Sequence, residues 1–208
     1  MLVLRTPLIL ASASPRRRRL LIQLGLEHEV CVPLVDETLP DNQALGPAVE
    51  AVAQRKAESI SRGTDIGNAL ILAADTLVIV DGEALGKPAD PVEAHSMLRR
   101  LSGRTHTVIT AIALVHPASL RRASAHTETH VTFASLSDDE IDAYVATGSP
   151  LDKAGAYGIQ DDHGALLIEC IDGDYYNVVG LPLRLLYVTL KAHFPDFVEH
   201  TSTRVEAA

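Results

Sequence analysis

This sequence has little cysteine, no tryptophan and no long apolar run. Its 208 residues include two cysteines and no tryptophan. Cys31 and Cys170 form no metal-binding or redox motif, and two thiols in a chain of this length are typical of a reduced, cytoplasmic protein. No apolar run approaches the ~20 residues of a membrane-spanning helix. Arg5 and Pro7 interrupt the apolar start, which is therefore a poor export signal. We expect a soluble cytoplasmic protein with no membrane partner.

Positive charge is also scarce. The chain carries 18 lysines and arginines against 27 aspartates and glutamates, a formal net charge of −9. A nonspecific nucleic-acid binder needs a broad positive field, so we expect no nucleic-acid partner, and any anionic ligand must be held by a local basic cluster. Apolar residues make up 47% of the chain, which is enough for a packed core, and no repeat or linker interrupts it. We expect one domain over residues 1–195 and a flexible tail over 196–208.

Helical and strand patterns alternate along the chain. The apolar run 8–11 predicts a buried strand, and Ser14 before Pro15 predicts the cap and first position of a helix that ends at Gly25. The apolar run 70–74 predicts a strand buried on both faces, and the chain should continue extended through Val80 to Asp81-Gly82, a dipeptide favoured in tight hairpins. Early alternation and later antiparallel pairs indicate a mixed sheet in an α/β domain. The other expected elements are a helix from about 47, helices over 90–103, 137–148 and 181–193, a long hairpin over 105–115 and 123–133, and a strand over 166–171.

Four arginines, Arg16 to Arg19, follow the first predicted strand. They stand at the start of a helix, where free N–H groups and the helix dipole attract phosphate. Positive charge opposes the dipole there, so the cluster makes sense if an anion binds. Arg17 precedes the apolar Leu20 and Leu21 by three and four residues, and its side chain should therefore point toward the buried side. The alternative is a solvated basic turn, above all for the last two arginines.

Asp75 is the best-placed carboxylate, because it follows the apolar run 70–74 at the carboxyl end of a predicted strand. Open α/β sheets place ligand-binding groups at this edge. A carboxylate there can hold a divalent ion or accept a proton from water. The alternative is an aspartate that caps a turn. Asp36 and Glu37 form the other early acidic pair that is placed to join it.

Two lysines stand in unusual places. Lys56 falls on the apolar stripe of the second predicted helix, so it must be paired, reach solvent with its tip, or be functional. Lys87 lies in the segment 82–88, which superficially resembles a phosphate-binding P-loop. The glycine spacing is one residue short, and Pro88 replaces the Ser or Thr that would bind magnesium. The sequence therefore excludes a P-loop NTPase.

Motifs spread over about residues 8–190 resemble the Maf family of nucleoside triphosphate pyrophosphatases. Each motif alone is a weak signal, but their number and order are specific. The segments that carry the resemblance are LASASPRR at 10–17, ADT at 74–76, LGKP at 85–88, LSGRTH at 101–106, YVATG at 144–148, LDKAGAYGIQ at 151–160 and NVVGLPL at 177–183.

The resemblance implies an elongated mixed β-sheet flanked by helices, similar to the fold of the inosine triphosphatase group, with two lobes around a nucleotide cleft, in a homodimer. It implies a hydrolase that cleaves a nucleoside triphosphate between its α- and β-phosphates. The segment 152–160 is similar to the branch that acts on dTTP and UTP, and modified pyrimidine nucleotides are further expected substrates. Nucleotide-pool housekeeping and cell-division arrest are the implied roles.

The resemblance also implies a role for each matching residue. Asp75 matches the family's proposed general base. Glu37, Lys56 and Lys87 match positions for metal and phosphate handling, with Glu37 and Asp75 as ligands of a divalent cation, Mg²⁺ or Mn²⁺. The substrate-binding positions, among which Arg16, Thr76 and Gln160 are tied to substrate choice, are Ser12, Ser14, Arg16, Arg17, Thr76 and Gln160.

Two departures from the family pattern leave the charged groups in place. Ala13 replaces the usual glycine of the first motif, and Asp161 and Asp162 follow Gln160 where a glycine is common. Two other functions stay open. One is a pyrophosphatase for 7-methyl-GTP or another modified nucleotide. The other is a non-catalytic nucleotide-binding regulator of septum formation, against which the intact acidic and basic set argues.

Overall fold

The computed structural model describes residues 2–63, 66–161 and 163–200, and the chain divides into two compact units. Unit 1 contains the residues up to 75, 111–125 and those from 183 onward. Unit 2 contains 76–110 and 126–182. Three long strands, β4 (Leu70–Val80), β6 (Thr105–His116) and β7 (Arg121–Phe133), each contribute residues to both units.

The strands form a mixed sheet, as the sequence predicts. In unit 1, β2 (Leu8–Ala11) pairs in parallel with both β3 (Glu29–Cys31) and β4. In unit 2, β5 (Glu83–Leu85) pairs antiparallel with β4, and β8 (Ile168–Asp172) pairs antiparallel with β7. The strand order is β3-β2-β4-β6-β7-β8, with β5 also on β4. The predicted long hairpin is confirmed, because β6 and β7 are neighbours joined by the short turn Pro117–Ser119.

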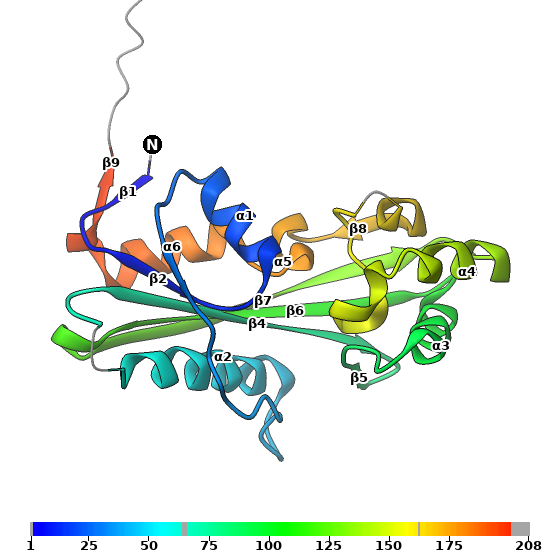
Figure 1. Ribbon diagram of the computed structural model, residues 1–208, viewed down its shortest axis with the longest axis horizontal. Helices are drawn as coiled ribbons and strands as arrows, with labels where there is room; N and C mark the ends of the chain where they lie inside the picture. Colours follow the sequence, from blue (N-terminus) through cyan, green and yellow to red (C-terminus); the bar gives the residue numbers. More distant parts are fainter. Residues whose placement is uncertain (1, 64–65, 162, 201–208) are drawn as a thin grey trace, which may run out of the picture. The chain divides into compact units, whose positions relative to one another are not determined.

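Helices cover both faces of the strands in unit 1. Figure 1 shows α2 (Leu45–Ser61) on one side of the strands, and α1 (Pro15–Gln23) and α6 (Leu183–His193) on the other. The predicted apolar stripe of α2 is confirmed, since Val49, Val52, Ala53 and Ile60 are all buried. No helix in the described ranges is long and apolar enough to cross a membrane.

The two ends of the described chain meet in unit 1. β1 (Leu2–Leu4) pairs antiparallel with β9 (Val198–His200), which follows the 3₁₀ turn Pro195–Phe197. Arg121 fixes this turn, because its Nη2 donates to Asp196 Oδ2 at 2.8 Å and its guanidinium lies 4.5 Å from the ring centroid of Phe197. The predicted tail over 196–208 therefore overlaps this turn and β9 at 196–200, and 201–208 lie outside the described residues.

Unit 2 has its own apolar core. Side chains of α3 (Pro91–Leu101), α4 (Asp138–Ala146) and the parts of the long strands that belong to unit 2 pack there, including Leu98, Val108, Phe133 and Ile141. The predicted strand over 166–171 begins later, at Ile168, because Gly164–Leu167 forms a 3₁₀ turn. The other short elements are the 3₁₀ turns Ser149–Asp152 and Ala154–Ala156 and the helix α5 (Tyr175–Val179).

Candidate active site

The start of α1 brings two serines and Arg17 together. Ser14 caps the helix, since its Oγ accepts a hydrogen bond from the backbone N–H of Arg17. The Oγ of Ser12 accepts the N–H of Ser14 at 3.1 Å and Nη1 of Arg17 at 3.2 Å. The serines thus fix the backbone and hold the guanidinium beside the helix N-terminus. Free N–H groups and a guanidinium thus lie together at the helix start, as the binding of an anion requires.

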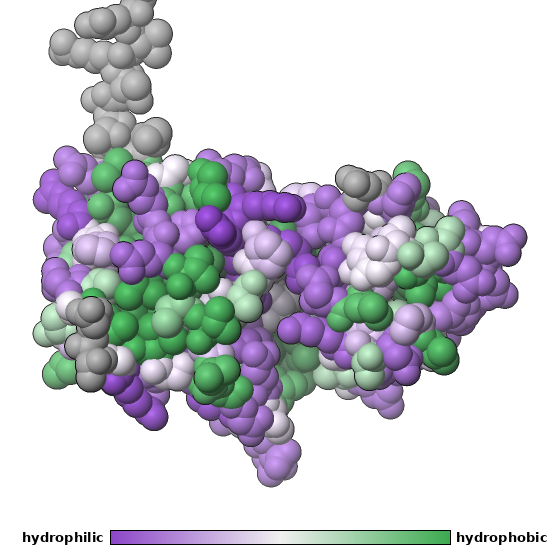
Figure 2. Space-filling model, in the orientation of Figure 1, coloured by the Kyte–Doolittle hydropathy of each residue, from purple (hydrophilic) through white to green (hydrophobic). Residues whose placement is uncertain are grey.

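The four arginines divide into two pairs. Arg16 and Arg17 are half-buried, whereas Arg18 and Arg19 are exposed. Figure 2 shows strongly hydrophilic side chains over α1. The prediction that Arg17 points toward the buried side is confirmed, and the solvated-turn interpretation holds for Arg18 and Arg19.

Lys56 joins the two carboxylates that the sequence predicts as metal ligands. It lies on α2 and is 5% exposed. Its Nζ lies 2.7 Å from Asp75 Oδ1 and 2.9 Å from Glu37 Oε2. A buried ammonium is costly unless it is paired, and here two carboxylates compensate its charge. Its place on an apolar stripe is therefore explained by this pairing.

Asp75 lies inside a strand and not at its carboxyl end, whereas the predicted extended chain through Val80 is confirmed. β4 continues without a break from Leu70 to Val80. The pairing of β4 with β2 stops at Ala73, because β2 ends at Ala11 and the chain turns into the capped start of α1. Asp75 lies just past the carboxyl edge of this parallel pair. Open sheets bind ligands at the carboxyl ends of their strands. Asp75 lies at the carboxyl end of β2, although its own strand, β4, continues past this edge.

The charges of unit 1 act on one another. Burial lowers the pKa of Arg17 below its ordinary value, Asp75 acts in the opposite direction, Arg16 lowers the pKa further and Glu37 raises it. Arginine stays protonated in proteins, so Arg17 keeps its charge. Unit 1 therefore brings together the predicted residues Ser12, Ser14, Arg16, Arg17, Glu37, Lys56 and Asp75.

The carboxylates of Glu37 and Asp75 fit a hard divalent cation. Both bind the same Lys56 nitrogen, so their oxygens converge on one region. Within the described part of the chain, no group of three His, Cys, Asp or Glu side chains could hold a metal ion. Mg²⁺ usually takes one or two carboxylates and completes its shell with water and substrate phosphates. The donor set therefore suits an ion bound together with a phosphate ligand.

Thr76 belongs to a chain of polar groups in unit 2. Its Oγ1 lies 3.0 Å from Thr110 Oγ1, which donates to the carbonyl oxygen of Asn177 at 2.8 Å. Asn177 is fully buried, and its amide donates to the carbonyl of Val108 at 2.9 Å and to Thr129 Oγ1 at 2.8 Å. The NVVG segment thus positions Thr76 through buried hydrogen bonds.

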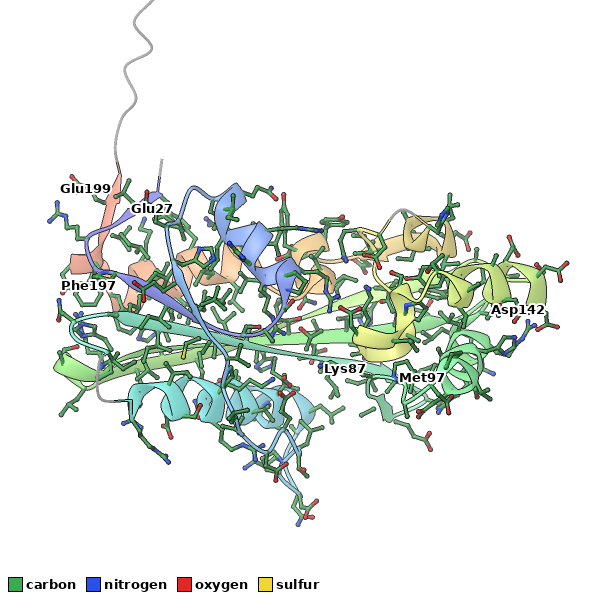
Figure 3. All side chains as sticks on the ribbon, in the orientation of Figure 1. Glu27, Lys87, Met97, Asp142, Phe197 and Glu199 are labelled. Carbon is green, nitrogen blue, oxygen red and sulfur yellow. The ribbon has the colours of Figure 1, made fainter. Side chains whose placement is uncertain are left out.

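Lys87 and Gln160 are the other two predicted residues in unit 2. Lys87 is exposed and follows β5 (Figure 3). The backbone before it is fixed, because the N–H of Gly155 donates to the carbonyl of Gly86 at 3.0 Å. Gln160 is half-buried, and its Nε2 donates to Asp161 Oδ1 at 2.9 Å.

The family model described as "Maf-like protein" matches residues 7–193. The chain belongs to the Maf family. A relative from Salinibacter ruber, named dTTP/UTP pyrophosphatase, is 52% identical over 97% of this chain and 98% of its own length. Relatives with the same name from Moorella thermoacetica and Symbiobacterium thermophilum are each 52% identical, over 85% and 91% of this chain and 89% and 96% of their own lengths. The resemblance inferred from the motifs is confirmed.

Two polar residues of this Maf chain lie beside Gln160 but were not assigned a role from the sequence. Lys153 is 7% exposed, and its Nζ lies 3.0 Å from Asp161 Oδ2. A lysine directly before the small and apolar run 154–159 is the signal that could have identified it, as for Lys56. Asp161 was visible only as a departure from the family glycine. Its neighbour Asp162 lies outside the described residues.

Proposed function

We propose that this chain is a nucleoside triphosphate pyrophosphatase that hydrolyses dTTP and UTP to the nucleoside monophosphate and pyrophosphate. The observation that carries the proposal is the pairing of buried Lys56 with both Glu37 and Asp75, close to the charge of Arg17. This set combines a base with positive charge, as cleavage of a phosphoanhydride requires. Relatives at 52% identity over most of the chain carry the name of this activity.

Asp75 is the proposed general base. Lys56 binds its Oδ1, and we assign the proton of the attacking water to the other carboxylate oxygen, Oδ2. The water oxygen attacks the α-phosphorus, and the bond to the β-phosphate oxygen breaks, so pyrophosphate leaves. Glu37 and Asp75 would hold Mg²⁺ or Mn²⁺, which neutralises phosphate charge when bound.

Positive charge and helix N–H groups bind the triphosphate in this proposal. Arg16 and Arg17 lie at the start of α1, where the serine-fixed backbone favours anions. Lys56 and Lys87 are assigned to the charge that develops on the phosphates. Thr76 and Gln160 are assigned to the pyrimidine, because an amide can both donate and accept hydrogen bonds at a base edge.

Pyrophosphate release tests the proposal. The purified chain is assayed with Mg²⁺ or Mn²⁺ on dTTP, UTP, CTP, GTP, ATP and 7-methyl-GTP, and we expect preferential turnover of dTTP and UTP. Asp75→Asn should abolish turnover with an unchanged far-UV circular dichroism spectrum. The matched control is Asp139→Asn, an exposed aspartate of α4.

Each other outcome favours a different function. Preference for 7-methyl-GTP would replace the substrate assignment, and full activity of Asp75→Asn would remove the base assignment. Tight nucleotide binding with no turnover would favour the non-catalytic regulator.

We also propose a homodimer in the cytoplasm with a housekeeping role in nucleotide pools, as the family resemblance implies. Sedimentation equilibrium tests the assembly, and a mass of one chain, 22.3 kDa, at micromolar concentration would contradict it.

A further inference from the structure

The side chain of Gln160 has a defined orientation in unit 2. Its Nε2 donates to Asp161 Oδ1 at 2.9 Å. An ionised carboxylate only accepts hydrogen bonds, so the amide nitrogen must face Asp161. The carbonyl oxygen of Gln160 is therefore the group turned away from this carboxylate.

Asp161 is itself held by its second oxygen. Oδ2 accepts from Ser149 Oγ at 2.6 Å and pairs with Lys153 Nζ at 3.0 Å. Lys153 is buried, and its Nζ also donates to the carbonyl of Ser149 at 2.5 Å and to Asp152 Oδ1 at 2.7 Å. One oxygen of Asp161 is thus occupied by two donors, which leaves the other for Gln160.

Gly158 packs closely against this carboxylate. A Cβ on Gly158 would lie 2.6 Å from Asp161 Oδ2 and 2.7 Å from Cε of Lys153, so a larger residue there would displace these two side chains. The N–H of Asp161 donates to the carbonyl of Gly158 at 3.1 Å, and the N–H of Gly158 donates to the Tyr144 hydroxyl at 3.1 Å. The turn is therefore fixed from both sides, and it fixes the direction from which Asp161 reaches Gln160.

We propose that Asp161, held by Lys153 and Ser149, is a positioning residue that makes Gln160 present its carbonyl oxygen to the base and so select uracil and thymine over cytosine. The inference rests on the proposed function, in which Gln160 contacts the pyrimidine. Uracil and thymine carry an N–H donor at N3, which a carbonyl oxygen accepts. Cytosine carries a bare N3 acceptor, which would face the same oxygen with no proton between them.

The proposal predicts that one substitution shifts the base preference from uracil toward cytosine and does not only lower activity. In Asp161→Asn, Lys153 can only donate, so the new side chain turns its oxygen to Lys153 and Ser149 and its NH₂ to Gln160. The Gln160 amide must then rotate to accept, and it presents its own NH₂ to the base. That NH₂ suits N3 of cytosine and opposes the N3–H of uracil.

The experiment compares kcat/KM for UTP and CTP in the unmodified chain and in Asp161→Asn. We expect the ratio of UTP to CTP to fall at least about tenfold, the value of one hydrogen bond, with a gain in CTP turnover as part of the change. Asp161→Gly, which releases the amide without reversing it, should lower the ratio by a smaller factor. The gain on CTP is a change that damage to the fold would not produce.

Asp152→Asn is the matched control. Asp152 also pairs with Lys153 Nζ, at 2.7 Å, and the substitution removes the same charge. Its side chain is 57% exposed. We expect the ratio to stay within about twofold of the unmodified chain.

Side-chain amide NMR gives a readout that does not need turnover. The NH₂ signals of Gln160, assigned by their loss in Gln160→Glu, should be protected from exchange in the unmodified chain and lose that protection in Asp161→Gly. Retained UTP turnover with an unchanged ratio in Asp161→Asn, or equal losses for both nucleotides, overturns the inference and leaves the proposed function standing. No turnover of any nucleotide by the unmodified chain contradicts the proposed function instead, and the NMR result still decides whether Asp161 fixes the amide.

Discussion

Lys56 is the residue on which the candidate site of unit 1 most depends. Its ammonium is the shared partner of Glu37 and Asp75, so its removal leaves two like charges facing each other. The rest of its side chain lies on the apolar face of α2, between Ala53 and Ile60. The ammonium therefore joins the two carboxylates while the stem packs on the apolar stripe, and a substitution can remove the first without the second.

We predict that Lys56→Met lowers kcat/KM for UTP by about 10²–10³, the usual effect of removing one preorganised electrostatic group. Methionine keeps an unbranched apolar stem on the stripe, so the far-UV spectrum should not change. Lys191→Met, at an exposed position of α6, is the control and should keep full activity. Activity within threefold of the unmodified chain in Lys56→Met would show that the lysine is only a packing residue.

His106 gives unit 2 a pH-dependent stability. It is 2% exposed, its Nε2 lies 2.7 Å from the Tyr157 hydroxyl, and its ring packs edge-on against Phe133. Burial lowers the pKa of His106 to about 4, from about 6.5 in the unfolded chain. The unfolded state therefore takes up the proton first as the pH falls.

The contribution of neutral His106 is complete above pH 6.5 and is lost as the pH falls toward 4. The shift corresponds to about 3 kcal/mol. We predict that His106→Phe is less stable at pH 7.5, because Tyr157 loses its partner, but loses about 3 kcal/mol less between pH 6.5 and 4 than the unmodified chain. Urea unfolding at a series of pH values measures this difference, and parallel curves for the two proteins would refute the assignment.

At the scale of elements, α4 shows how a short helix is fixed at its start. Ser137 and Glu140 form a reciprocal capping box, in which Ser137 Oγ accepts the N–H of Glu140 and Glu140 Oε2 accepts the N–H of Ser137 at 2.8 Å. Acidic residues fill the first turn, where the helix dipole favours them.

We predict that Ser137→Ala costs about 1 kcal/mol of stability, the usual value of an N-cap, and lowers the melting temperature by roughly 2–4 °C. Ser96→Ala, at an exposed position inside α3, should leave it unchanged or raise it slightly, because alanine is the better helix former. Thermal melts by circular dichroism compare the two, and equal shifts would show that the capping box contributes nothing.

Elements fixed by local signals are the ones that the sequence predicts. The Ser14 cap, the α2 stripe and the Ser137 box each depend on residues within a turn or two, and all are confirmed. By contrast, the turn and strand over 195–200 depend on Arg121, which lies 75 positions before its partner Asp196. Contacts between residues far apart in the sequence leave no periodic pattern that could predict them.

The same limit applies to the candidate site. Lys56 pairs with Glu37, which lies 19 positions away. The sequence shows that a lysine interrupts an apolar stripe, but it does not show which carboxylate pairs with that lysine. Asp161 contacts Gln160, its direct neighbour, yet the sequence alone does not show that Lys153 and Ser149 occupy the other carboxylate oxygen. The sequence shows that residue 161 is an aspartate. The conformation of the chain around it decides which groups bind its two oxygens.

At the scale of the whole molecule, the three long strands decide how the two units unfold. β4, β6 and β7 each supply residues to unit 1 and to unit 2. Unfolding one unit alone would break a strand in its middle and leave its neighbours with unpaired backbone groups, which is costly. Stability should therefore be shared over the sheet.

We predict one cooperative thermal transition, with equal calorimetric and van't Hoff enthalpies. Matched substitutions test it, one in each unit. Ile60→Val in α2 of unit 1 and Ser137→Ala in unit 2 should each cost about 1 kcal/mol and move the same transition by roughly 2–4 °C. If the transition instead splits and each substitution moves only one part, the strands do not couple the units, and each unit must be stable on the strength of its own core.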